Sequence, residues 1–95
     1  MSTKRLYQKE IEAKLDELDA KIAQLQLKAQ QANADMQHQY EVQLSTLSQR
    51  REVAKHKLDE LVHSSEAAWE AIKGGVEGAV DELQSAFDKA ITQFQ

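Results

Sequence analysis

The chain contains no proline, and its first glycine is Gly74. Nothing before that position therefore has to interrupt an α-helix, because proline and glycine are the residues that most disfavour a helix interior. Alanine, leucine, glutamate, glutamine, lysine and arginine, which have the highest helix propensities, dominate the sequence. No segment alternates apolar and polar residues as a half-buried strand would. The sequence predicts an all-α protein, with its 95 residues in a single coiled-coil helical domain.

Apolar residues near the N-terminus recur at alternating steps of four and three, which is the heptad pattern of a coiled coil. This seam consists of Ile11, Leu15, Leu18, Ile22, Leu25, Ala29, Ala32 and Met36. Beside it, Lys14 falls at a g position and Asp19 at an e position. In a parallel in-register pair of chains these two residues would meet across the interface, which weakly favours parallel pairing.

The rhythm changes after Met36, where Tyr40 and Leu44 follow at steps of four before the heptad resumes. This zone is either a stutter inside one continuous helix or a short loop near residues 33–35 that folds the first 60 residues into a hairpin. The absence of glycine and proline favours the continuous helix.

A clearer break lies at residues 62–65, where Ser64 or Ser65 suits a helix N-cap. We therefore expect a helical hairpin of two helices, a long one near residues 3–63 and a shorter one near 65–94.

The expected second helix carries an apolar stripe at steps of three, four and four, an eleven-residue repeat that stays on one side of a straight helix. The stripe consists of Trp69, Ile72, Val76, Val80, Leu83, Phe87, Ile91 and Phe94. Packing within the chain against the first helix is the favoured role of this stripe. Binding to a membrane surface or to a foreign protein are the alternatives, and the acidic residues around the stripe argue against anionic lipids.

The lengths of the two expected helices predict a partner. The second helix is about half as long as the first, so after folding back it would leave much of the N-terminal seam exposed. An exposed aliphatic face of that length calls for another molecule, and a homodimer is the simplest closed assembly. We expect self-association, as a homodimer or a higher oligomer, through Ile11, Leu15, Leu18, Ile22 and Leu25.

No residue pattern in the chain predicts catalysis or a cofactor. Glu60-x-x-His63 and Asp35-x-x-His38 have the spacing of carboxylate-bridged metal sites, but in the heptad frame Glu60 and His63 point away from the seam. Cysteine is absent, and we expect no metal site, no cofactor and no enzymatic activity. The net charge of −4 arises entirely from residues 66–95, which argues against a nucleic-acid partner.

The N-terminal residues Met1–Arg5 are followed by no apolar segment of the kind found in signal peptides, and no run of apolar residues is long enough to cross a membrane. The expected location is the cytoplasm.

Two segments resemble a family of small bacterial coiled-coil proteins, with cyanobacterial and proteobacterial members, that are described as stress-response proteins. One runs from Ala68 through the Trp69-bearing stretch to Ala90, and the other covers residues 14–22. Members of that family tend to have a glycine near the helix junction, where this chain has Ser65 and Glu66. The resemblance implies a bacterial protein induced under stress, and it carries no catalytic residues.

These observations together predict a non-enzymatic structural or interaction protein that associates with itself and contributes to bacterial stress tolerance. The alternative function is that of an amphipathic helical protein that binds to, or protects, a membrane surface.

Overall fold

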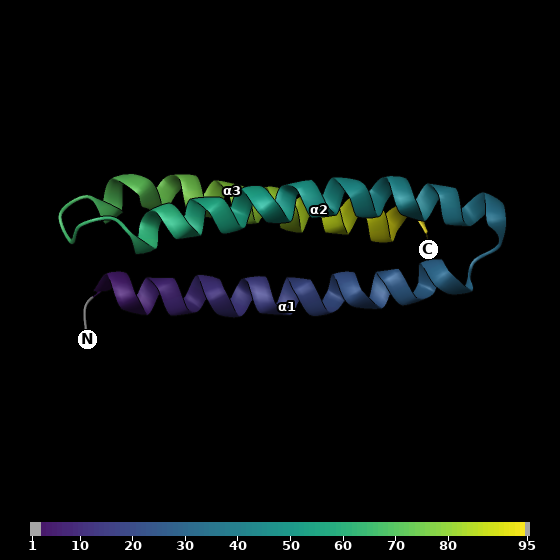
Figure 1. Ribbon diagram of the computed structural model, residues 1–95, viewed down its shortest axis with the longest axis horizontal. Helices are drawn as coiled ribbons and strands as arrows, with labels where there is room; N and C mark the ends of the chain where they lie inside the picture. The colour runs from purple at the N-terminus through teal and green to yellow at the C-terminus, as the bar shows by residue number, and fades with distance from the viewer. Residues whose placement is uncertain (1–2, 95) are drawn as a thin grey trace.

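The computed structural model describes residues 3–94 and consists of three α-helices in that range. Helix α1 spans Thr3–Gln31, α2 spans Ala34–Val62 and α3 spans Trp69–Gln93. The chain runs along α1, turns back along α2 and turns again along α3, so α1 and α3 run in the same direction (Figure 1). The all-α prediction is confirmed, whereas the predicted layout of two helices is wrong.

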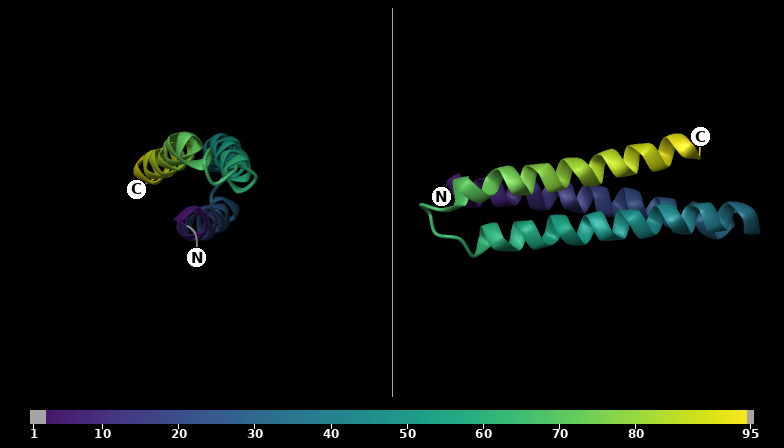
Figure 2. Two further views of the ribbon diagram at one scale, coloured as in Figure 1. Left: turned by 90° about the vertical axis from the view of Figure 1, so that its left-hand side faces the viewer. Right: turned by 90° about the horizontal axis from the view of Figure 1, so that it is seen from above.

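The three helices form an elongated bundle with dimensions of 51 × 19 × 18 Å. Seen end-on, they occupy the corners of a triangle, with α1 below the pair formed by α2 and α3 (Figure 2). Helix α2 packs most extensively on α3, less on α1, and α1 and α3 contact each other least. The N-terminal end of α1 lies beside the α2–α3 link, and the C-terminal end of α3 lies beside the α1–α2 link (Figure 1).

The continuous helix expected over residues 3–63 is interrupted at Ala32 and Asn33, which form the hairpin that the sequence had offered as the alternative. Asn33 has φ −70° and ψ 169°, and its side-chain Oδ1 accepts a hydrogen bond from the backbone N–H of Met36. Asp35 adds a negative charge in the first turn of α2, where it interacts favourably with the helix dipole. Asn33 is therefore an N-cap. The turn stabilises the fold because it lets the apolar α1 seam be buried within the chain.

The second link covers residues 63–68, so α3 begins about four residues later than the sequence predicted. His63 is the C-cap of α2, and its backbone N–H donates to the carbonyl of Asp59. Ser65 caps the turn that follows, because its Oγ accepts from the N–H of Ala68 and its carbonyl accepts from Trp69. Lys4 donates to the carbonyls of Val62 and Ser64, which places a positive charge at the C-terminus of α2.

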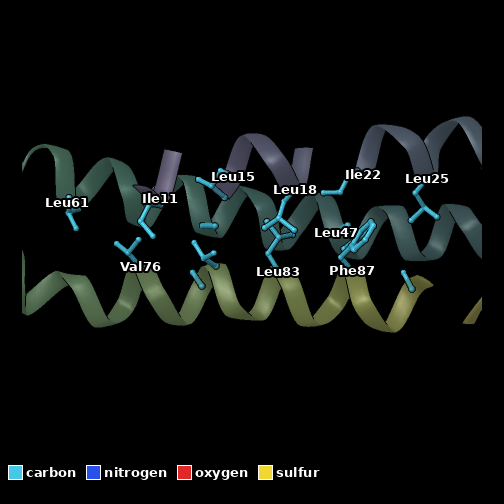
Figure 3. Close-up of a cluster of buried hydrophobic side chains, with 14 of the residues drawn as sticks. Ile11, Leu15, Leu18, Ile22, Leu25, Leu47, Leu61, Val76, Leu83 and Phe87 are labelled. Carbon is cyan, nitrogen blue, oxygen red and sulfur yellow. The ribbon is translucent and has the colours of Figure 1, made fainter. Parts of the chain in front are cut away.

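The core of the bundle is a single apolar column between the helices. Figure 3 shows the labelled side chains of α1, α2 and α3 pointing into this shared space. Leu47, Leu61, Val76 and Leu83 are completely buried, as are the smaller Ala54 and Ala90. Within the part of the chain that the structure describes, no polar or charged residue is buried. Burial of this apolar column is the main source of stability, since it removes the stripes of all three helices from water.

Candidate interface between α1 and the α2–α3 pair

The five residues predicted to mediate self-association lie inside the bundle. Each of them is at most 8% exposed, and all point from α1 toward α2 and α3; they are Ile11, Leu15, Leu18, Ile22 and Leu25 (Figure 3). The seam is therefore not the exposed surface that the two-helix layout implied. Its partner in this structure is the α2–α3 pair of the same chain, and its use between chains stays a prediction.

The α3 stripe faces the other two helices, whereas the sequence predicted that it would pack against a single first helix. Trp69, Val76, Val80, Leu83 and Phe87 are buried. The remaining three positions are partly buried and pack against the core; they are Ile72, Ile91 and Phe94. Small residues beside the stripe, Ala79 and Ala90, are also buried, which lets the neighbouring backbones approach closely.

An ion pair joins α1 to α2 halfway along the bundle. The guanidinium of Arg51 donates two hydrogen bonds to the carboxylate of Asp19, and the one from Nη2 to Oδ2 measures 2.9 Å. Such two-point contact fixes the relative orientation of the two groups as well as attracting them. The hydrogen bonds from Arg51 hold the pKa of Asp19 below its ordinary value. The side chain of Arg51 is therefore partly exposed and lies at the junction between α1 and α2.

Replacing Asp19 with asparagine is expected to lower the free energy of unfolding at neutral pH by up to about 1 kcal/mol, the range for partly exposed ion pairs. Because the folded state lowers the pKa of Asp19 from 3.8, the pair stabilises the protein fully above that value. Its contribution is lost as the pH falls through the lower pKa of the folded state. Urea denaturation of the two proteins at neutral pH and at about pH 2 measures both effects.

The difference between the wild-type protein and Asp19→Asn should be smaller at the acidic pH, because protonation of Asp19 removes the charge that pairs with Arg51. Glu82→Gln is the matched control, because Glu82 forms a single, more exposed contact with Arg50 at 3.4 Å. We expect this control to change stability less than Asp19→Asn does at neutral pH. An Asp19→Asn effect of equal size at both pH values would contradict a role for the carboxylate charge.

Aromatic residues close the end of the bundle at which α1 and α3 begin. The rings of Tyr7 and Trp69 lie 5.8 Å apart between centroids, and the ammonium of Lys73 lies 5.0 Å from the Tyr7 ring. Both geometries are attractive, since aromatic rings favour offset contacts and bind cations over their faces. Burial, followed by the charge of Glu77, raises the pKa of Tyr7 well above its ordinary value of 10.0. Tyr7 is thus neutral and serves as a packing residue between α1 and α3.

The opposite end of the bundle is closed by a second aromatic pair. Tyr40, near the start of α2, stacks on Phe94 at the end of α3, with centroids 3.9 Å apart and planes within 15° of parallel. Gln43 also donates to the side chain of Gln93 at 2.7 Å. These contacts hold the end of α3 beside the turn at Asn33, but α1 takes no part in either of them.

The histidine patterns considered in the sequence lie on the surface of the bundle. His56 contacts Glu60 at 3.2 Å and His63 contacts Asp59 at 3.4 Å, in both cases one helical turn apart on α2. Among residues 3–94, no three histidine, aspartate or glutamate side chains come together in a group that could hold a metal ion. These contacts have the geometry of ordinary pairs on an exposed helix face.

Surface hollows follow the junctions between helices. The hollow between α1 and α2 has an apolar floor that includes Leu15, Leu58 and Val62, and its rim carries Asp16 and Lys55. It lies beside the Asp19–Arg51 pair. An apolar floor with charges of both signs at its edge suits contact with another side chain or helix.

Comparison with protein-family models, with curated proteins and with solved structures gave no match. The resemblance to stress-response coiled-coil proteins therefore remains an expectation from the sequence. In the described part of the chain, no helix is both long and apolar enough to cross a membrane.

Two contacts of this interface were not anticipated from the sequence. Tyr7 lies four residues before Ile11, so an extension of the heptad by one step would have included it. Asp19 was expected to meet a lysine of a second chain, whereas the structure pairs it with Arg51. No local signal identifies that pair, because the two residues are 32 positions apart and meet only after the chain turns at Asn33.

Proposed function

We propose that this protein acts without catalysing a reaction, through helix–helix contacts that it makes with copies of itself. The observation that carries the proposal is the continuous apolar face of α1. This helix presents one continuous aliphatic seam, from Ile11 to Leu25, to a surface formed by two other helices. Such seams recognise complementary helical surfaces through close packing of side chains.

The packing of the bundle makes α1 its most separable element. Helices α2 and α3 pack more extensively on each other than either does on α1. Between α1 and α2 the link is only two residues long, and it contains no glycine or proline. Any second molecule that offers the same α2–α3 surface could accept the seam, and a second copy of the chain offers it by definition.

Sedimentation velocity of the full chain over a range of concentrations tests the proposal. A species of twice the monomer mass that increases with concentration is expected. A monomer at every concentration from micromolar to millimolar would contradict it. Leu27→Ala serves as a control for the solvent-facing side of α1, because Leu27 is 58% exposed. The Leu27→Ala variant should form dimers with the same dissociation constant as the wild-type protein if the seam, and not the outer face of α1, mediates association.

The biological setting of the proposal comes from the resemblance of residues 14–22 and 68–90 to small bacterial stress-response proteins. In that setting the helical assembly would contribute to tolerance of stress. Deleting the gene and restoring it with either the wild-type protein or Leu18→Asp, which disrupts the seam, tests this role. Equal stress survival with and without the gene would contradict it.

Binding to a membrane surface is the alternative function, and α3 is the helix best suited to it because its apolar residues form one stripe. In the bundle that stripe is covered, and Trp69 is only 4% exposed. Lipid binding would therefore require the bundle to open. Trp69 is the only tryptophan, so a change in its fluorescence spectrum on adding anionic or neutral vesicles tests whether the protein binds lipid. A spectrum that lipid leaves unchanged would rule this alternative out.

A further inference from the structure

We propose that two copies of this chain exchange their α1 helices, by extending the turn at Ala32 and Asn33 into one continuous helix from α1 through α2. In the exchanged dimer, α1 of each chain would pack on α2 and α3 of the other. The inference rests on the proposed self-association and names the route by which it occurs.

The first observation is that the buried faces of α1 and α2 are in phase across the turn. Apolar residues continue at steps of three and four through the link itself, at Ala29, Ala32, Met36 and Tyr40. At 3.6 residues per turn, the buried positions of both helices fall within an arc of about 80°. Those positions are Tyr7, Ile11, Leu15, Leu18, Ile22, Leu25, Ala29, Tyr40, Leu47, Ala54 and Leu61. A straightened helix would thus present one unbroken stripe to a partner.

The second observation is that little holds the turn in its bent form. The φ of Asn33 is −70°, which is already helical, so its extended ψ of 169° is the angle that must change. No residue in the described chain has a positive φ, and Ala32 and Ala34 are strong helix formers. Straightening loses the hydrogen bond from Met36 N–H to Asn33 Oδ1 at 3.0 Å. It also gives helical partners to backbone groups that the two helix ends leave unpaired.

The third observation concerns symmetry. Residues of α1 and of the C-terminal half of α2 that contact each other lie at nearly equal distances along the sequence from the turn. The midpoint between Asp19 and Arg51 is residue 35, and the midpoint between Lys4 and Val62 is residue 33. Two long antiparallel helices that cross near this point would recreate the same contacts between chains. The seam residues at the crossing are Ala29, Ala32 and Met36, which are small or flexible enough for a close approach.

A second copy is the partner that preserves every contact of α1. The seam, the Asp19–Arg51 ion pair and the Tyr7–Trp69 ring contact would each form between chains instead of within one. Exchange of an identical element is a common route to dimers, particularly where the hinge is short.

Cross-linking distinguishes exchange from any other dimer. Because the chain has no native cysteine, only the introduced thiols can react with the cross-linker. The double variant Asp19→Cys with Arg51→Cys places thiols on α1 and α2, to be joined by a short bismaleimide in the isolated dimer. Exchange predicts covalent dimers on a denaturing gel. The control, Arg50→Cys with Glu82→Cys, joins α2 to α3 and should give cross-linked monomers from the same fraction.

Two hinge variants test the straightening itself. Asn33→Ala removes the cap and should tighten the dimer about 25-fold, because each of the two hinges contributes roughly fivefold. Asn33→Pro fits the observed φ of −70° but would break a continuous helix, so it should abolish the dimer while the monomer keeps its helix content. Circular dichroism of both variants confirms that the monomers fold.

The outcomes separate the two proposals. A dimer that contains only intrachain cross-links between α1 and α2, or that persists in Asn33→Pro, overturns exchange and leaves self-association standing. A wild-type protein and an Asn33→Ala variant that both stay monomeric overturn self-association as well. Covalent dimers, together with the opposite effects of the two hinge variants, would establish exchange.

Discussion

Replacing Leu83 with alanine is expected to lower the free energy of unfolding by about 2–5 kcal/mol. Leu83 lies midway along α3, is completely buried and points into the space shared with α1 and α2 (Figure 3). Truncation leaves a cavity there, because helices held on both sides cannot collapse into it. A loss of this size is a large part of the total stability of about 5–15 kcal/mol that is usual for a domain. Urea denaturation followed by circular dichroism measures it.

Leu27→Ala is the matched control, because it makes the same chemical change on the exposed side of α1. With Leu27 58% exposed, the substitution should alter stability by no more than about 0.5 kcal/mol. Equal effects of the two substitutions would contradict the packing of α3 at the centre of the bundle.

Helix content and the buried faces of the helices could be read from the sequence, because both depend on local spacing. The apolar residues of the seam and of the α3 stripe recur at steps that place them on one side of a helix. The structure buries the seam from Ile11 to Leu25 and the stripe positions Trp69, Val76 and Leu83. Periodicity alone, however, does not say which surface covers each face.

The turn at Asn33 could not be decided locally. Asparagine is a good N-cap and Asp35 suits a first turn, but neither residue prevents a helix from continuing. The in-phase apolar residues on both sides of the turn, such as Ala29 and Met36, are compatible with either arrangement. The difference is the burial of the α1 seam against distant segments, a tertiary effect that outweighs the small local preference for helix.

The turn at Asn33 determines which surface covers the α1 seam. A continuous helix would leave the seam uncovered unless a second molecule packed on it, whereas in the hairpin residues 34–93 of the same chain cover it. The proposed exchanged dimer would connect the two arrangements, since it would have the long helix that the spacing favours and the contacts that the hairpin makes. The balance between monomer and proposed dimer would then depend on chain concentration and on the cap at Asn33.

Replacing Trp69 with alanine is expected to destabilise the protein by about 3–5 kcal/mol, the range for removing a buried large aromatic side chain. Trp69 is the first residue of α3, is 4% exposed and contacts the ring of Tyr7. Its removal opens the end of the bundle where α1 meets α3, and the charge of Lys73 loses an aromatic face 5.8 Å away. Because the only tryptophan is lost, unfolding by urea is followed by far-ultraviolet circular dichroism.

Trp69→Phe separates the aromatic contact from the cavity. Phenylalanine keeps a ring opposite Tyr7 and above the Lys73 ammonium while losing volume, so this variant should retain more than half of the stability lost in Trp69→Ala. Equal loss in both variants would show that a phenyl ring restores none of the stability, and that the full indole side chain is required at this position. A Trp69→Ala protein as stable as the wild type would contradict the role of the Tyr7–Trp69 contact in joining α1 to α3 at this end of the bundle.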